Sequence, residues 1–401
     1  MTRQADNWLK TYGEYTKESE SPDIYHLWTG LSVLASAVRR NLYLDQGIYQ
    51  VIPNLYVILI GPRGKVKKST TIRMGRKILL AADDILFGPD SLTRAELIAE
   101  LARAGEGRTQ SALTIHSSEF SSLVDPSGIP MIQFLTDIFD GDFSWRYATK
   151  GSGKYEINKP SLNILAGTTP TWLAEDFPAQ VIGHGFISRV VFVYAGQERF
   201  ANPRPARPDP EIVRVLQEDL RHIASLEGEF KWGERSTELY DKLYHNIKNN
   251  PPKDAKVEGF HYRKDLMLLK VSMLLSVAES DSLVIEPKHI STAWKLLNGV
   301  EKEMPKAFQA VGRYEKSAEL SRILEHIQTT GKVSIAEIYR THMTSASGRE
   351  IVEMLEMLIQ SGEIVKDVDS RNKVFFRPTD DAIPAMQRVD PKDDQPQKTD
   401  A

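Results

Sequence analysis

The stretch that most constrains the fold of this chain is residues 55–74, LYVILIGPRGKVKKSTTIRM. Its apolar start, Leu55–Ile60, has the length and the β-branched content of a buried strand. A short loop with Gly61, Gly64 and three lysines follows, and Ser69-Thr70 then opens a helix-like segment. This order is the layout of a phosphate-binding loop, in which main-chain amides and the helix dipole face the phosphates. The alternative is a basic surface turn after a core strand.

The loop can be aligned with the phosphate-binding motif G-x-x-x-x-G-K-[ST] in two registers. Counting from Gly61 places Val66 at the second glycine, Lys67 at the lysine and Lys68 where the hydroxyl residue belongs. Counting back from the Lys68-Ser69 pair restores the hydroxyl in a loop that is one residue longer. Because a β-branched valine is strained where a turn needs a positive φ, the second register is preferred.

Composition and charge limit the classes of function that remain. The chain has 401 residues, a formal net charge of −3 and no cysteine. This length allows two or three domains, and a nucleic-acid surface would have to be local. The lack of cysteine excludes disulfides, thiol catalysis and cysteine-based zinc sites. The start has no signal-peptide pattern and no run approaches a membrane span, so a soluble cytoplasmic protein with no membrane partner is expected.

Changes in sequence pattern divide the chain into segments. The leader, residues 1–52, carries aromatic residues at helical spacing, which we expect in the core. Residues 53–200 alternate strand-like and helix-like stretches, which predicts an α/β fold with the parallel sheet of a P-loop NTPase core, RecA-like or AAA-like. Residues 201–315 start with a proline-rich boundary and form a helical, lid-like domain. Residues 316–378 have the pattern of a C-terminal winged-helix domain, and residues 379–401 are expected to be a disordered tail.

Several element boundaries are predicted within these segments. Asn41–Gln50 reads as a short hairpin with a turn at Asp45-Gln46-Gly47. Helices are expected at Thr70–Ala82, after an N-cap at Ser91, and at Phe134–Gly141. In the winged-helix segment we expect helices at 318–328, 335–342 and 347–361 and strands at 363–365 and 374–376.

Polar residues follow two of the predicted core strands. Glu119 comes shortly after the strand Ala112–His116, where P-loop enzymes hold the carboxylate that orients Mg²⁺ or the attacking water. Thr168 and Thr169 follow the strand Ser161–Ala166, and their hydroxyls could contact the γ-phosphate or its water. The alternative for Glu119 is a solvated residue that the helix dipole favours at a helix N-terminus.

Basic residues further along the chain are candidates for phosphate contacts. Arg189 follows a glycine pair at 183–185 and precedes the strand Val190–Tyr194, which suits an arginine finger acting on a neighbour's nucleotide. Arg263 and Lys270 lie at a helix start and on an apolar helix, and either could reach back to the nucleotide as a lid contact. The alternatives are an ordinary salt-bridge arginine, a surface arginine and a snorkelling lysine.

Two basic turns are candidates for DNA contact. The turn Thr149–Lys154 carries Lys150 and Lys154 and could face a nucleic-acid backbone in a central channel, or be a plain hairpin tip. In the winged-helix segment the wing offers Lys366, Arg371 and Lys373. The third helix argues against groove reading, because it carries Glu350, Glu353 and Glu356 against only Arg349. DNA contact and protein contact by this domain therefore remain equal alternatives.

Several separated stretches resemble a family of phage and prophage P-loop ATPases, the primase–helicase-like or replicative-helicase-like proteins. The resemblance covers roughly residues 5–300. It is carried by Pro22, Tyr25, Trp28, Pro53-Asn54-Leu55-Tyr56-Val57, Gly61-Pro62-Arg63-Gly64, Lys67-Lys68-Ser69-Thr70, Ser118-Glu119, Thr168-Thr169-Pro170 and Gly185-Phe186-x-Ser188-Arg189.

The resemblance implies roles for individual residues. The loop is similar to the family pattern G-P-x-G-x-x-[RK]-K-[GS]-T, which makes Lys68 the phosphate lysine and gives the Mg²⁺ hydroxyl to Ser69 or Thr70. It also implies that Glu119 is the acidic residue near Mg²⁺, that Thr168 or Thr169 is the sensor and that Arg189 is the finger. A single acid at Ser118-Glu119 replaces the usual Asp-Glu pair, which leaves Mg²⁺ placement open. ATP contacts are expected from Gly61, Pro62, Arg63, Gly64, Lys65, Val66, Lys67, Lys68, Ser69, Thr70, Thr168, Thr169 and Arg263.

The function that the resemblance implies is an ATP-hydrolysing ring motor of phage DNA replication, a helicase on single-stranded DNA in a bacterial cell that carries the phage. A homo-oligomer, with six as the expected number, would hold ATP and Mg²⁺ between neighbours, and a primase or an initiator is a possible partner. An alternative is an ATP-switched initiator or helicase loader that binds DNA through the winged-helix domain without unwinding it. A third interpretation is an ATPase that remodels or senses proteins.

Overall fold

The computed structural model divides the chain into two compact units, residues 1–310 and residues 311–401. The first unit contains the leader, the α/β core and the helical segment that follows the core. The second contains the helices and strands from α11 onward. The described residues are 3–124, 128–141, 144–149, 153–175, 177, 185–308, 313–343, 346–369 and 373–379.

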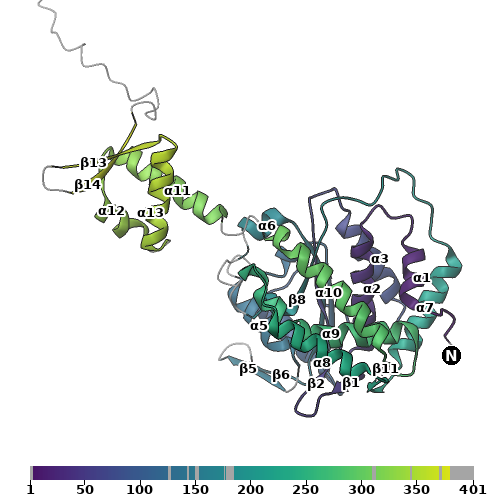
Figure 1. Cartoon of the computed structure of the whole chain (residues 1–401). Helices are drawn as coiled ribbons and strands as arrows, with labels where there is room; N and C mark the ends of the chain where they lie inside the picture. The colour runs from purple at the N-terminus through teal and green to yellow at the C-terminus, as the bar shows by residue number, and fades with distance from the viewer. Residues whose placement is uncertain are drawn as a thin grey trace, which may run out of the picture. The chain divides into compact units, whose positions relative to one another are not determined.

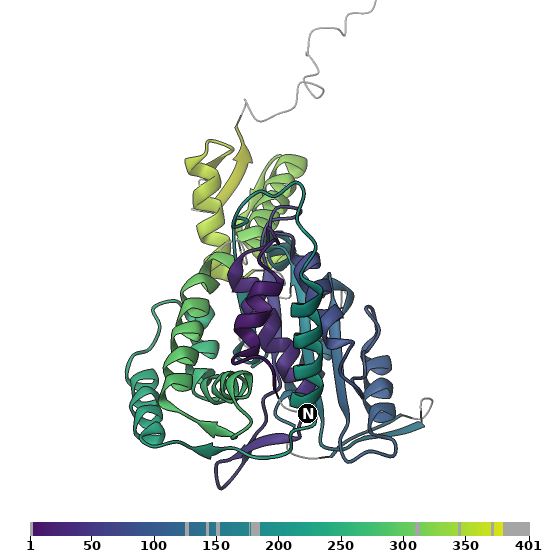
Figure 2. The same cartoon turned by 90° about the vertical axis from the view of Figure 1, so that its right-hand side faces the viewer.

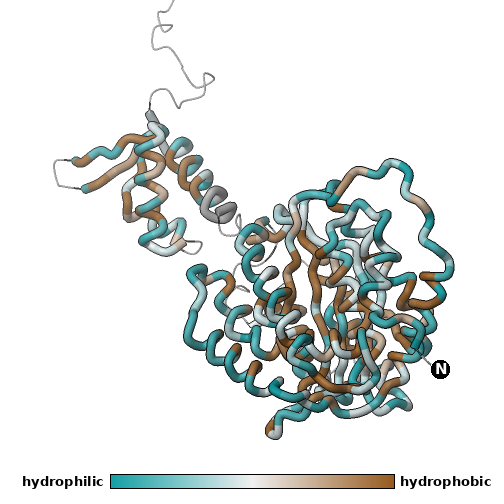
Figure 3. Tube along the Cα trace, turned by 45° about the vertical axis from the view of Figure 1, so that its right-hand side comes forward, coloured by the Kyte–Doolittle hydropathy of each residue, from teal (hydrophilic) through white to brown (hydrophobic). Residues whose placement is uncertain are grey.

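A parallel sheet forms the centre of the first unit (Figure 1). Its strands lie in the order β4-β7-β3-β8, and each neighbouring pair is parallel. Their side chains are largely buried, as expected for a sheet that is covered on both faces, and these strands form an apolar centre in Figure 3. The expected α/β fold with a parallel sheet is therefore confirmed. The strands are β3 (Tyr56–Ile60), β4 (Ala112–Ser117), β7 (Ser161–Thr168) and β8 (Val190–Tyr194).

Helices from the leader and the core cover this sheet. The helices α2 and α3 pack against each other and against β7, while α5 packs on β7 and α4 packs on β4. A β-hairpin, β5–β6, lies between α5 and β7 in the chain. The bounds are α1 (Trp8–Tyr15), α2 (Asp23–Val38), α3 (Lys68–Leu79), α4 (Arg94–Gly105), η1 (Phe120–Ser122), α5 (Ile129–Phe139), β5 (Trp145–Thr149), β6 (Gly153–Ile157), α6 (Pro170–Glu175) and η3 (Ile187–Arg189).

Two predicted helix starts are wrong for a local reason. The helix α3 starts at Lys68 instead of Thr70, because Lys67 takes a left-handed conformation with φ of 49° and the helix begins directly after it. The N-cap of α4 is Thr93 instead of Ser91, and the side chain of Thr93 accepts a hydrogen bond from the amide of Glu96. Threonine and serine are both good N-caps, so spacing alone does not choose between them.

The predicted helix at Phe134–Gly141 starts too late. The helix α5 begins at Ile129 and ends at Phe139, with Pro130 in its first turn. Proline is tolerated there because its missing N–H has no acceptor within the helix at that position. The helix therefore includes Pro130, which lies before the predicted start.

The leader aromatics belong to the core, as expected. Trp8, Tyr12, Tyr25 and Trp28 are each at most 1% exposed. The indole N–H of Trp8 donates to the carbonyl of Leu216, 3.0 Å away, which joins α1 to the helix α7. The predicted hairpin is also present, as β1 (Leu42–Asp45) and β2 (Gln50–Val51) in antiparallel pairing.

The helical segment after the core packs onto it in the first unit. The long helix α9 lies against α2 and η3, and α10 lies against β8 (Figures 1 and 2). The ammonium of Lys270 on α9 donates to the carbonyl of Ile52, 2.8 Å away, so it fixes α9 beside the residues that lead into β3. The elements are α7 (Pro210–Ala224), β9 (Gly228–Glu229), β10 (Lys231–Trp232), α8 (Ser236–Asn249), η4 (Ala255–Val257), α9 (Glu258–Glu279), β11 (Val284–Ile285) and α10 (Pro287–Ala307).

The parallel sheet has two edges that carry different residues. At the carboxyl edge the chain leaves β3 into the glycine loop, β4 into Ser118-Glu119 and β7 into Thr169. At the amino edge the chain enters β3 from Ile52–Leu55 and enters β8 from Arg189. Because a strand rises about 3.3 Å per residue, the length of β3 separates the two edges by roughly 13 Å.

The second unit combines the helices α11, α12 and α13 with a small sheet of order β12-β14-β13. Its core is apolar and includes Ile323, Ile351, Leu355 and Phe376. The structure adds the short strand β12, which the sequence pattern did not predict, because a two-residue strand carries no readable alternation. The elements are α11 (Arg313–Thr330), β12 (Val333–Ser334), α12 (Ile335–His342), α13 (Gly348–Gln360), β13 (Ile364–Val368) and β14 (Val374–Pro378). The predicted disordered tail lies, beyond Thr379, outside the described residues.

Two buried histidines predict an acid-sensitive fold. Burial, helped by Arg199, lowers the pKa of His26 from 6.5 to about 4, and burial, helped by Arg76, lowers that of His116 to about 3. Below pH 6.5 these imidazoles bind protons in the unfolded chain but stay neutral in the folded chain. The free energy of unfolding therefore falls as the pH falls from 6.5 toward 4 for His26 and toward 3 for His116. At 1.36 kcal/mol per pH unit, each histidine costs on the order of 2 kcal/mol of stability between pH 6.5 and 5.

Urea unfolding at pH 7 and pH 5 measures this effect. The variant His116→Leu should lose less stability on acidification than the unmodified chain, whereas His245→Gln, at an exposed position on α8, should lose the same amount. Equal losses in all three proteins would contradict a role for His116.

Candidate nucleotide-binding site

The loop after β3 turns at two residues with positive φ, Gly64 at 74° and Lys67 at 49°. Val66 is not one of them, and its side chain is fully buried under the loop. Gly61 sits so close to its neighbours that a Cβ there would lie 2.4 Å from the carbonyl oxygen of Ala195. The chain therefore needs glycine at position 61, where a side chain would not fit. At position 67 it needs a residue that can adopt the left-handed backbone conformation.

Lys68 lies inside the loop rather than on its surface. Its ammonium donates to the carbonyl of Gly61, 2.7 Å away, and to that of Pro62, 3.3 Å away. Burial lowers the pKa of Lys68 below its usual value, and the nearby Glu119 carboxylate opposes this shift. The neighbouring Lys67 is exposed instead and forms an ion pair with Glu20 at 3.5 Å. The two neighbouring lysines thus have different surroundings, and Lys68, the lysine of the preferred register, is the one inside the loop.

The hydroxyl residues predicted to hold Mg²⁺ lie in the first turn of α3. Ser69 is exposed, and Thr70 is half-buried, with its hydroxyl 3.5 Å from a guanidinium nitrogen of Arg73. The hydroxyl of Thr71 instead points back to the carbonyl of Lys67, 3.4 Å away. Ser69 and Thr70 therefore remain the two hydroxyls of the loop that face outward beside Lys68.

Glu119 lies at the exit of β4 with an exposed side chain. Its main chain is held in place, because the hydroxyl of Ser122 donates to its carbonyl oxygen at 2.7 Å and that of Ser117 at 2.9 Å. Gly167 of β7 lies between this exit and the loop. A Cβ on Gly167 would come 2.8 Å from the carbonyl oxygen of Ser118 and 3.5 Å from the Cβ of Lys68. The strand β7 thus brings Glu119 and Lys68 to the same place.

The two threonines after β7 differ in position. Thr168 is buried, and its carbonyl accepts the amide of Gly61 at 3.4 Å, so it lies beside the start of the loop. The hydroxyl of Thr169 accepts the amide of Trp172 at 3.2 Å and so caps α6. Both residues are brought to the carboxyl edge of the sheet together with Lys68.

The leader contributes contacts to the loop that were not predicted. The hydroxyl of Tyr25 donates to the carbonyl of Ile60 at 2.6 Å, and the hydroxyl of Ser21 donates to that of Lys67 at 3.1 Å. A cavity of about 370 Å³ lies between the leader, α3 and the proline-rich segment. Tyr15, Met74, Pro205 and Pro208 give it a mainly apolar surface, and Glu18, Thr70, Arg73 and Lys77 line it as well. Proline at these positions in the sequence signals a linker, and gives no sign that the segment closes a cavity.

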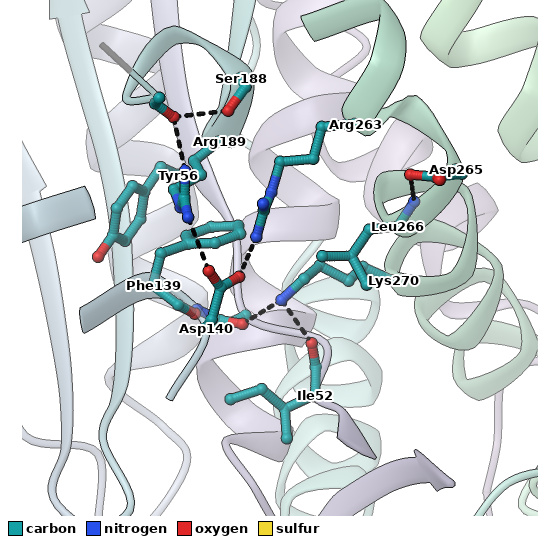
Figure 4. Close-up of polar contacts among 12 residues, drawn as sticks. Ile52, Tyr56, Phe139, Asp140, Ser188, Arg189, Arg263, Asp265, Leu266 and Lys270 are labelled. Atoms are coloured by element: carbon teal, nitrogen blue, oxygen red, sulfur yellow. Dashed lines mark hydrogen bonds and ion pairs between the residues drawn. The ribbon is translucent and has the colours of Figure 1, made fainter. Parts of the chain in front are cut away.

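Arg189 and Arg263 lie at the other edge of the sheet (Figure 4). Arg189 donates to a carboxylate oxygen of Asp140 at 2.8 Å and to the carbonyl of Gly185 at 2.8 Å. Arg263 forms an ion pair with the other carboxylate oxygen of Asp140. The expectation that Arg263 and Lys270 reach back to the chain's own nucleotide as lid contacts is thus not met, because α9 packs on the amino edge. Asp140 was not predicted as a site residue, because nothing in the sequence near it indicates its two arginine partners.

The candidate DNA-binding residues are partly described. Lys154 is exposed on β6, where it pairs with Ala148 of β5, and Lys373 is exposed at the start of β14. Lys150 and Arg371 lie outside the described residues. In α13 the exposed face includes Glu353 and Glu356, and Glu353 pairs with Arg349 at 3.4 Å.

Metal-binding clusters and membrane-spanning helices are both absent from the described residues. In that part of the chain, no group of three or more histidine or acidic side chains is placed to hold a metal ion. None of its helices combines the length and the apolar character that crossing a bilayer requires.

Comparison with known proteins finds similarity to solved structures, among them that of an MCM homolog. No protein-family profile matches the sequence, and no curated protein matches it. The fold is similar to that in a crystal structure analysis of a full-length MCM homolog from Methanopyrus kandleri, with 13% sequence identity and a TM-score of 0.44. The match covers 73% of this chain and 59% of that chain, so this chain spans less than two thirds of the length of that homolog.

Proposed function

We propose that the first unit binds and hydrolyses ATP. The observation that carries this proposal is the meeting of Lys68, Glu119 and Thr168 at the carboxyl edge of the parallel sheet, beside a glycine loop that opens a helix. The loop amides and the dipole of α3 favour phosphate at that place. When ATP binds, the ammonium of Lys68 would donate its hydrogen bonds to phosphate oxygens in place of the loop carbonyls. The carboxylate of Glu119 would orient the attacking water molecule.

The donor set at this edge suits a magnesium ion. Ser69, Thr70 and Glu119 offer hard oxygen atoms, which Mg²⁺ prefers, and the ion usually keeps several waters and the substrate phosphates as its other ligands. When bound, Mg²⁺ supplies charge neutralisation on the phosphate oxygens. A single carboxylate is sufficient in such a site, because the remaining positions are taken by water.

The apolar cavity beside α3 is the place we assign to the nucleotide base. It begins at Thr70, close to the residues proposed for Mg²⁺, and continues to Met74 and Tyr15. Its volume of about 370 Å³ accommodates a flat heteroaromatic ring, and Pro205 and Pro208 close it from the side of the linker.

The wider proposal is a ring motor of phage DNA replication that moves on single-stranded DNA. Arg189 lies roughly 13 Å or more from its own loop, which supports the proposal that it serves the loop of a second copy instead. A ring of identical copies, with six as the expected number, joins such edges head to tail. The hairpin β5–β6 with Lys154 is the proposed DNA contact of this unit.

The test is an ATPase assay with and without single-stranded DNA, combined with particle mass with and without ATP. A motor hydrolyses ATP faster when DNA is present, forms a ring, and separates a forked duplex. ATP hydrolysis without strand separation, together with binding of duplex DNA, favours the second candidate, a loader or initiator that uses the second unit as a winged-helix domain. The helix and strand order of that unit supports this role.

A third candidate, action on proteins, is supported by the outer face of α13. Beside its glutamates this face exposes Val352, Met357 and Ile359, which suit a protein partner better than a phosphate backbone. An ATPase rate that does not respond to any DNA would favour this candidate.

The position of Gly167 gives a further prediction. In Gly167→Ala the new methyl group would lie 2.8 Å from the carbonyl oxygen of Ser118, so the backbone that carries Glu119 must shift. We expect ATP turnover to fall at least about tenfold, since misplaced catalytic groups cost on that order or more. The control is Gly299→Ala on α10, where a Cβ meets nothing within 4 Å and turnover should be unchanged. Unchanged turnover in Gly167→Ala would contradict the placement of Glu119.

A further inference from the structure

One carboxylate at the amino edge of the sheet holds two arginines. Asp140 directly follows α5, and its two oxygens are divided between the guanidinium groups of Arg189 and Arg263 (Figure 4). The arginines come from segments more than 70 residues apart, the η3 turn and the helix α9. Only the fold brings them together, and Asp140 sets the spacing between their planar groups.

Positive charge exceeds negative charge around this carboxylate. Burial alone would raise the pKa of Asp140, but Arg263, Arg189 and Lys270 hold it below its ordinary value. Asp265 also lines the site, and it pairs with Lys248 at 3.2 Å. Three cations therefore share the single carboxylate of Asp140. The excess positive charge attracts an anion to this edge of the sheet.

Each of the two arginines also has a hydrogen-bond donor that is not used. The Nε–H groups of Arg189 and Arg263 are buried and have no acceptor among the described residues. Arg263 lines a cavity of about 620 Å³ together with Asp140, Ser188 and Lys270 among others. Gly185, whose carbonyl accepts a hydrogen bond from Arg189, lines the same cavity. A planar guanidinium with unused donors suits an oxyanion with several oxygens, such as a phosphate group.

The anion cannot come from the nucleotide of the same chain. The glycine loop lies at the opposite edge, roughly 13 Å away along β3. A second copy of the chain that presents its loop to this edge would bring phosphate oxygens to both arginines at once.

We propose that Arg263 acts together with Arg189 on the terminal phosphates of a nucleotide held by a second copy, and that Asp140 is the residue that positions both arginines. This inference rests on the proposed ATPase function and deepens it. Arg189 and Arg263 touch the substrate, whereas Asp140 acts through them. Without Asp140 the two guanidinium groups repel each other and lose their common alignment.

Mixing of inactive variants tests this assignment. An interface works in trans only if one copy keeps Lys68 and the facing copy keeps both Arg189 and Arg263. Arg263→Ala should lower ATP turnover at least tenfold, and an equal mixture with Lys68→Ala, combined before ATP is added, should regain activity, because about a quarter of head-to-tail interfaces are then intact. A mixture of Arg263→Ala with Arg189→Ala should regain nothing, since both defects lie on the same edge.

A contact of Arg263 with the nucleotide of its own chain predicts the reverse pattern. Arg263→Ala would then be rescued by Arg189→Ala but not by Lys68→Ala, and this result would overturn the proposal. Turnover of Arg263→Ala equal to that of the unmodified chain would overturn it as well. If the unmodified chain hydrolyses no ATP, or Lys68→Ala is as active as it, the proposed function itself fails instead.

Asp140→Asn separates positioning from mere support of the fold. It should behave as the arginine variants do, with rescue by Lys68→Ala and none by Arg189→Ala, while Asp140→Glu should keep part of the turnover. A thermal melt checks that each variant is folded. Arg214→Ala is the control, since Arg214 on α7 also pairs with two carboxylates, Glu211 and Glu218, but should keep full turnover. Rescue of Asp140→Asn by Arg189→Ala, or full activity of Asp140→Asn, would contradict the positioning role.

Discussion

Lys68→Ala is expected to abolish ATP turnover, with a loss of at least about a hundredfold, the effect of removing one preorganised donor to developing charge. The reason is the place of the ammonium, which lies inside the glycine loop within 2.7 Å of the carbonyl oxygen of Gly61. No other cation of the loop has this position among the described residues, because Lys67 points outward to Glu20. Steady-state phosphate release measures the effect.

The matched control is the adjacent lysine. Lys67→Ala removes an exposed ammonium and its ion pair with Glu20, and such exposed pairs contribute little. Its turnover should remain close to that of the unmodified chain. If Lys67→Ala lost activity and Lys68→Ala kept it, the register of the loop would be the one that counts from Gly61, and the assignment of Ser69 and Thr70 would fail with it.

Arg189→Ala is expected to lower turnover by about a thousandfold, the lower range for loss of an arginine finger, while ATP binding stays largely intact. Binding is kept because Arg189 lies at the amino edge of the sheet and the glycine loop lies at the carboxyl edge. Equilibrium binding of a fluorescent ATP analogue, compared with phosphate release, separates the two effects.

Mixing the two variants shows whether Arg189 serves a second copy. Arg189→Ala and Lys68→Ala are each inactive alone, but a mixed ring contains interfaces with an intact loop facing an intact finger. Recovered turnover that depends on the mixing ratio supports the ring. No recovery at any ratio, with both proteins folded, would contradict it.

The residues at the carboxyl edge were predictable because each lies at the end of a predicted strand or in the short stretch of chain that follows it. Lys68, Glu119 and Thr168 lie close to the ends of runs with the apolar, β-branched pattern of buried strands. Once those strands are parallel, their ends must meet at one edge of the sheet. Sequence periodicity therefore determines which residues meet there, and local geometry adds that Lys68, rather than Lys67, lies inside the loop.

The amino edge was not predictable in the same way. Asp140 ends a helix, Arg189 ends a short turn and Arg263 lies in a helix more than 70 residues later, and no spacing rule connects them. The predicted lid contact of Arg263 assumed that the helical segment folds over the glycine loop. The packing of α9, with Lys270 bonded to the carbonyl of Ile52, places it at the other edge.

By itself, the sequence determined the parallel α/β core and the residues that leave its strands toward the glycine loop, because apolar periodicity and loop chemistry act over short stretches of chain. The tertiary structure alone decided that Arg189 and Arg263 share Asp140 and that the proline-rich segment closes a cavity beside α3. These contacts depend on how distant helices pack, and packing is set by the shape of whole surfaces rather than by any local pattern.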